Sequence, residues 1–83
     1  MPPRIGRRWQ TRFGRFVQGY GVERLVDALG QHGSPVTPSA VYSWMSGAGT
    51  PRAERMSALV RISGGSVTPQ AILDHRETVR EQR

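Results

Sequence analysis

The stretch 36-VTPSAVYSWMSGAGTPRAERM-56 contains the dipeptide Thr-Pro twice, and a third copy follows it. A helix leaves its first backbone N–H groups without partners inside the helix, and a threonine hydroxyl just before the helix can accept from one of them. Proline suits the next position, because its missing N–H is not needed there and its φ is already helical. Each copy therefore predicts a helix that begins at its proline. The copies are Thr37-Pro38, Thr50-Pro51 and Thr68-Pro69.

Apolar residues recur at helical spacing in five segments, and no segment alternates as a strand would. Glycine favours the left-handed conformation that ends a helix, and we expect Gly30 and Gly47 to act in this way. We expect Trp9 and Trp44 to be buried, since both lie on apolar faces. The predicted fold is all-α, a compact bundle of about five short helices. The helices are expected at about 9–20, 22–29, 38–45, 51–63 and from 69 onward.

The chain has 83 residues, a length that suits one domain. Residues 1–8 are basic and are expected to form a flexible arm. Residues 9–73 carry the helical pattern and form the predicted domain. Residues 74–83 are polar and predict either a C-terminal tail or an extension of the last helix.

Composition excludes several classes of protein. The chain has no cysteine, which rules out disulfides and thiolate chemistry and is typical of a reducing cytoplasm. No apolar run is long enough to cross a membrane, and no apolar region of a signal peptide follows the basic start. We therefore expect a soluble, cytoplasmic protein that does not bind membranes.

The sequence also lacks the patterns that catalysis would need. His32 and His75 have neither cysteine nor clustered carboxylates around them in the sequence, so no metal site is expected. The glycine motifs that bind phosphate are absent, and no Ser-His-acid set can be assembled. We expect neither an enzyme nor a cofactor.

Charge gives the strongest indication of a partner. The formal net charge is +6, and all basic residues other than histidine are arginine. An acid-free basic end on a small domain is typical of proteins that bind polyanions. A solvated tail and an arginine-rich genome are the alternatives. The arginines that precede the first acidic residue, Glu23, are Arg4, Arg7, Arg8, Arg12 and Arg15.

The helix that follows Thr37 has two different faces. At 100° per residue, Ala40, Val41 and Trp44 share one apolar side. The opposite side carries small or uncharged residues, whereas a merely solvated helix usually carries charges there. Such a helix can lie close against another surface, and the major groove of DNA admits one. The residues of this outer side are Pro38, Ser39, Tyr42, Ser43 and Ser46.

The order of these pieces resembles the Cro/CI-type (lambda-repressor-like) helix-turn-helix domains over residues 21–64. The segment VERLVDALG is similar to their first motif helix, and TPSAVYSWMSG is similar to their recognition helix. The segment TPRAERMSALVRISGGSVTPQAIL resembles their fourth helix and the entry to the fifth. The resemblance implies a five-helix fold that contains a helix-turn-helix and binds DNA.

The resemblance also implies roles for matching positions. Thr37 would contact phosphate, and the loop 47–52 would follow the DNA backbone. Arg52 and Arg55 begin the next helix and can reach phosphate, although surface solvation explains them equally well. Tyr42 can contact a thymine methyl or donate a hydrogen bond from its hydroxyl. The serines can bond to more than one base and so discriminate weakly. The expected base contacts are Pro38, Ser39, Tyr42, Ser43 and Ser46.

The sequence therefore predicts a DNA-binding transcriptional regulator, in the sense of a bacterial or phage repressor, that places residues 38–46 in the major groove. A homodimer is expected, because one short helix reads few bases and helix-turn-helix proteins pair half-sites one DNA turn apart. Two alternatives remain at this point. The same scaffold can dock on a protein such as a polymerase, a nuclease or another regulator, or it can bind RNA.

Overall fold

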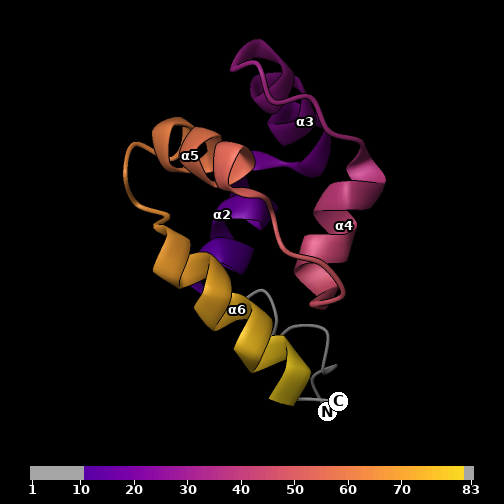
Figure 1. The fold of residues 1–83 in the computed structure, drawn as a ribbon, viewed down its shortest axis with the longest axis vertical. Helices are drawn as coiled ribbons and strands as arrows, with labels where there is room; N and C mark the ends of the chain where they lie inside the picture. The colour runs from indigo at the N-terminus through magenta and orange to yellow at the C-terminus, as the bar shows by residue number, and fades with distance from the viewer. Residues whose placement is uncertain (1–10, 82–83) are drawn as a thin grey trace.

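A computed structural model of the protein describes residues 11–81. These residues form five α-helices and no strand, as the sequence predicts, and the helices pack into one compact bundle (Figure 1). Trp9 and Arg4, Arg7 and Arg8 lie outside the described residues. The helices are α2 (Arg12–Tyr20), α3 (Val22–Gln31), α4 (Pro38–Ser46), α5 (Ala53–Ile62) and α6 (Pro69–Glu81).

Two of the three Thr-Pro pairs begin helices in the predicted way. The Thr37 hydroxyl oxygen accepts a hydrogen bond from the Ala40 amide at 3.3 Å, and Pro38 is the first residue of α4. Thr68 does the same for the Ala71 amide at 3.1 Å at the start of α6. Both helix starts thus follow from local chemistry, a hydroxyl acceptor followed by a residue that needs no N–H partner.

The third pair, Thr50-Pro51, does not begin a helix, and this prediction was wrong. Helix α5 starts at Ala53, and its N-cap position is held by Arg52, which makes no side-chain capping bond. The chain before it is fixed by other contacts, because two amides of the turn after α4 bond to one carbonyl oxygen of that helix. Pro51 is then buried in the connection instead of opening α5.

The end of α3 also differs from the prediction, since Gly30 lies inside the helix. The left-handed residue is Gly33, with φ of 79°. The Ser34 amide bonds to the Leu29 carbonyl at 2.9 Å, and the Gly33 amide bonds to the Gly30 carbonyl at 3.1 Å. This is the paired arrangement of a Schellman ending, and it moves the end of the helix beyond the first glycine.

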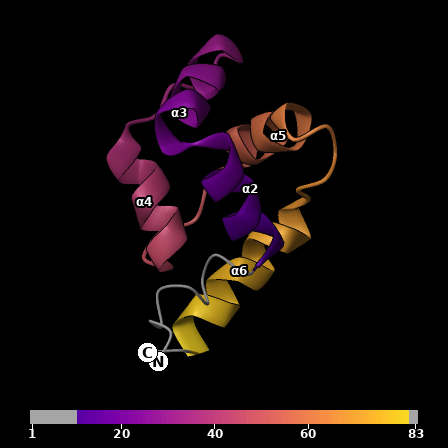
Figure 2. The same cartoon turned by 180° about the vertical axis from the view of Figure 1, so that it is seen from behind.

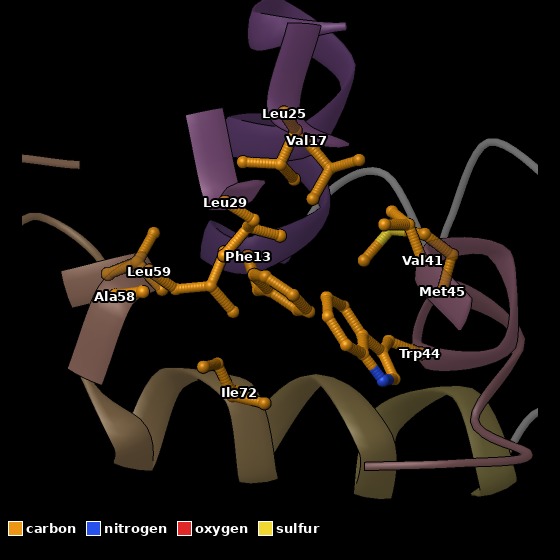
Figure 3. Packing of buried hydrophobic residues seen from close by; sticks show 11 residues of the cluster. Phe13, Val17, Leu25, Leu29, Val41, Trp44, Met45, Ala58, Leu59 and Ile72 are labelled. Atoms are coloured by element: carbon orange, nitrogen blue, oxygen red, sulfur yellow. The ribbon is translucent and has the colours of Figure 1, made fainter. Parts of the chain in front are cut away.

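The core collects side chains from all five helices around Phe13 (Figure 3). Trp44 is 6% exposed and packs with Phe13 in this cluster, so the prediction that it is buried is confirmed. The other members are Val17, Leu25, Leu29, Val41, Met45, Ala58, Leu59, Val67 and Ile72.

A buried histidine joins three helices. His75 of α6 is 1% exposed, and its Nδ1 lies 2.5 Å from the hydroxyl of Thr11, the N-cap residue of α2. Its Nε2 lies 3.0 Å from the carbonyl oxygen of Met45 in the last turn of α4. Helix α6 continues past His75 to Glu81, and Val79 is buried in this last part.

Helix α4 lies at one edge of the bundle, with α3 and α6 as neighbours. The connection between α5 and α6 lies at the opposite edge in both views of the molecule (Figures 1 and 2). One side of α4 is therefore buried against the core while residues on its other side are exposed.

Candidate nucleic-acid interface

Helix α4 is fixed rigidly at both ends. Thr37 caps its start, and Gly47 ends it in the left-handed conformation with φ of 79°. A Cβ at Gly47 would lie 3.3 Å from Cγ1 of Val79, so the turn also packs directly against α6. Val41 and Met45 are buried beneath the helix. These contacts hold the outer side of α4 in one orientation.

Three of the five predicted base-reading residues lie in the open. Pro38 and Ser39 are exposed, and Tyr42 is 56% exposed, the largest value among the large apolar side chains of residues 11–81. Spacings of three and four residues place these side chains beside one another on a helix. We call Pro38, Ser39 and Tyr42 the α4 face. It carries no charge.

The other two predicted base readers, Ser43 and Ser46, are half-buried and take part in the end of the helix. The Ser46 hydroxyl donates to the Ser43 carbonyl at 3.1 Å and accepts from the Ala48 amide at 3.4 Å. The Ser43 hydroxyl oxygen lies only 2.7 Å from where a Cβ of Gly49 would stand. Both side chains thus contact the turn 47–49 and are only half-exposed, although helical spacing places Ser43 beside Ser39 and Ser46 beside Tyr42.

The predicted phosphate-contacting residues divide in the same way. Thr37 is exposed; its oxygen accepts the capping bond, so its hydroxyl proton can still be donated to a phosphate. Arg52 is exposed in the connection between α4 and α5. Arg55 is half-buried, and its Nη2 donates to the Pro35 carbonyl oxygen at 3.2 Å. Arg55 therefore links α5 to the connection between α3 and α4 by a hydrogen bond.

The described arginines of the acid-free basic end belong to a helix. Arg12 and Arg15 are exposed residues of α2. Nη1 of Arg12 donates to the Ser66 carbonyl oxygen at 3.4 Å, in the connection between α5 and α6. That connection and α4 lie on opposite sides of the molecule, so Arg12 is not next to the α4 face (Figures 1 and 2).

One arginine beside α4 was not among the predicted site residues. Arg80 of α6 is exposed, and its Nε donates to the Gly47 carbonyl oxygen at 3.4 Å. This bond leaves the two terminal nitrogens of its guanidinium for another acceptor. The helical spacing of Ile72, His75 and Val79 is the sequence signal that would have extended α6 this far.

The surroundings of α4 favour an anionic partner. No acidic residue occurs between Asp27 and Glu54, so none lies on α4 or on either of its connections. Arg80 supplies positive charge beside the end of the helix, and Arg52 supplies it at the start of α5. A phosphate that approaches the end of α4 therefore meets Arg80, and neither α4 nor its two connections add an acidic side chain.

Neither a metal-binding cluster nor a membrane-spanning helix is found among residues 11–81. No group of three or more His, Cys, Asp or Glu side chains is placed to hold a metal ion there. None of the described helices combines the length and the apolar character needed to cross a bilayer.

Comparison of the chain with protein-family models, with curated proteins and with solved structures finds no match. The geometry of the α4 face and the arginines near it are therefore the basis for a functional proposal.

Proposed function

We propose that the protein is a DNA-binding regulator in which α3 and α4 act as a helix-turn-helix pair and α4 enters the major groove. The observation that carries this proposal is the α4 face: an exposed, uncharged surface on a short helix that is buried on its other side and has Arg80 beside its end. Such a helix can approach base edges closely while a nearby arginine binds a phosphate.

The connection between α3 and α4 departs from the usual helix-turn-helix pattern. Residues 32–37 separate the two helices, whereas helix-turn-helix motifs commonly use about three to four residues. A longer turn would ordinarily let the second helix change its angle. The bond from Arg55 to the Pro35 carbonyl ties this turn to α5.

The proposal includes dimerisation and membership of the Cro/CI-type family. A helix of nine residues faces only a few base pairs, and two copies on a pseudo-palindromic site would double the contacted sequence. The order of α3, α4 and α5 supports the family assignment, together with the sequence resemblance over residues 21–64. Regulation would follow from occupation of a promoter or operator.

The test is a set of titrations on two duplexes, one selected from a random pool by the protein itself and one with the same composition in scrambled order. Arg52→Ala and Arg80→Ala should each flatten the slope of log K against log[salt] by about one unit, because each removes one phosphate contact. Arg61→Ala is the matched control. Arg61 is also exposed but lies in the last turn of α5, so its loss should leave the slope unchanged.

Equal binding of wild-type protein to the selected and scrambled duplexes would contradict sequence-specific recognition. Such a result would favour the alternative that α4 docks on another protein. A slope that flattens equally in Arg61→Ala would show that the whole surface binds DNA, without a preferred role for the end of α4.

A further inference from the structure

The α4 face lacks the side chains that read purines most directly. Arginine reads guanine and asparagine or glutamine reads adenine through paired hydrogen bonds in the major groove. None of these residue types occurs in α4. The face instead offers the ring of Pro38, the hydroxyl of Ser39 and the phenol of Tyr42. Most of its surface is therefore apolar.

Two serine hydroxyls that could otherwise bond to bases lie against the turn at the end of the helix. The Ser46 hydroxyl donates to the Ser43 carbonyl and accepts from the Ala48 amide. The Ser43 side chain lies against Gly49. The apolar part of the face thus has to supply most of the direct discrimination between bases. Tyr42 dominates it, because it is more than half exposed and is the only aromatic ring there.

The major groove has one apolar feature at a base edge, the C5-methyl group of thymine. We infer that Tyr42 is a specificity-determining residue that reads this methyl group with its ring, and that Pro38, one helical turn earlier, extends the same contact. This inference rests on the proposed DNA-binding function. It has a second consequence: 5-methylcytosine carries its methyl group at the same ring position, so methylation of a cytosine that faces Tyr42 would strengthen binding.

The charges around the face select DNA as the occupant. An apolar patch with a tyrosine would also suit a protein groove, but the chain from Ala28 to Ala53 carries no acidic residue. Arg80 lies beside the end of the helix, where a phosphate backbone that borders the groove would pass, and Arg52 adds a positive charge at the start of α5. The apolar contact and the charges therefore match the base edge and the backbone of one partner.

The experiment compares matched duplexes that differ only in methyl groups. The protein first selects its preferred duplex from a randomised pool, and each thymine of that duplex is then replaced in turn by deoxyuridine, which pairs identically. Wild-type protein should bind about fourfold more weakly for each contacted methyl that is removed, the value expected from burial of one methyl-sized group. Replacing a neighbouring cytosine by 5-methylcytosine should have the opposite effect at a position that faces Tyr42.

Three variants show which side chain causes the preference for thymine over deoxyuridine. Tyr42→Ala should bind the thymine and deoxyuridine duplexes equally, because the ring is gone. Tyr42→Phe should keep the preference for thymine, because it retains the ring and loses only the hydroxyl. Leu73→Ala removes the other exposed large apolar side chain of residues 11–81, which lies on α6, and should keep the preference as well.

Each outcome decides one point. A selected duplex whose affinity does not change with deoxyuridine would overturn methyl reading while leaving DNA recognition in place. A loss of discrimination in Tyr42→Phe would assign the effect to the hydroxyl and also overturn the inference. If the pool yields no preferred duplex, the proposed function itself fails, and methyl reading fails with it.

Discussion

Nε2 of the His75 imidazole lies 3.0 Å from the carbonyl oxygen of Met45, a residue 30 positions earlier in the chain. A carbonyl only accepts, so Nε2 donates to it, and Nδ1 lies within hydrogen-bond distance of the Thr11 hydroxyl. Thr11 also accepts from the Gly14 amide at 2.9 Å. One ring therefore connects the start of α2 with the end of α4, the helix that carries the candidate interface.

Replacing His75 by phenylalanine should test this connection without emptying the core. The ring volume is kept, but the hydrogen bonds to Met45 and Thr11 are lost, and buried polar groups without partners cost about 1–3 kcal/mol. The free energy of unfolding from urea titration should fall by that amount. His32→Phe is the control, because His32 is exposed and its replacement should change stability by less than about 0.5 kcal/mol.

The Thr-Pro pairs provide a matched test of helix capping. Thr37→Ala should lower the free energy of unfolding by about 0.5–2 kcal/mol, since the Ala40 amide loses its acceptor. Thr50→Ala removes the same hydroxyl from the same dipeptide, but Thr50 caps no helix and should cost clearly less. Equal losses in the two variants would show that the hydroxyl at Thr37 acts through something other than its cap.

Trp44 and Tyr42 test the orientation of α4. Trp44→Ala empties a buried site and should cost about 3–5 kcal/mol, enough to unfold much of so small a domain. Tyr42→Ala alters an exposed site and should change the melting temperature little. If Trp44→Ala were as stable as wild type and Tyr42→Ala unfolded, the two faces of α4 would have to be exchanged.

Two glycines should respond to alanine with opposite signs. Gly47→Ala forces a Cβ into a left-handed conformation and to 3.3 Å from Val79, so it should destabilise by more than about 1 kcal/mol. Gly30→Ala lies within α3 with nothing within 4 Å of the new Cβ, and should stabilise by about 0.5–1 kcal/mol. Thermal unfolding of the two variants measures both effects.

Deletion of residues 1–8 tests the predicted basic arm. Arg4, Arg7 and Arg8 leave with this segment. If each neutralises one phosphate, the slope of log K against log[salt] should flatten by about 2–3 units for every duplex tested. An unchanged slope would identify the segment as a plain tail. A loss of preference confined to A·T positions would place it in the minor groove.

The sequence predicts those features of the fold that depend on neighbouring residues. The caps at Thr37 and Thr68 and the turn at Gly47 need only local chemistry, and all three are confirmed. Thr50 carries the same local signal and fails, because the path of the chain there is fixed by the bonds of Ala48 and Gly49 to the Ser43 carbonyl. A dipeptide rule cannot include such contacts.

The same limit applies to the candidate site. Helical periodicity places Pro38, Ser39 and Tyr42 on the outer face, and the structure exposes all three. Periodicity assigns Ser43 to that face too, but it cannot show that the turn after the helix folds back against it. The bond from Arg80 to Gly47 joins positions 33 apart in the chain, a relation that only the packing of α6 establishes.

The link between Thr11 and His75 spans 64 positions, and Phe13 meets the His75 ring edge-on at a centroid distance of 5.5 Å. The contacts of α2 with His75 therefore form only when α6 arrives. Closing so long a loop costs chain entropy before any contact repays it, which affects the rate of folding more than the final stability. During synthesis the bonds and ring contact of His75 with α2 form last, so the domain completes its fold only after α6 has left the ribosome.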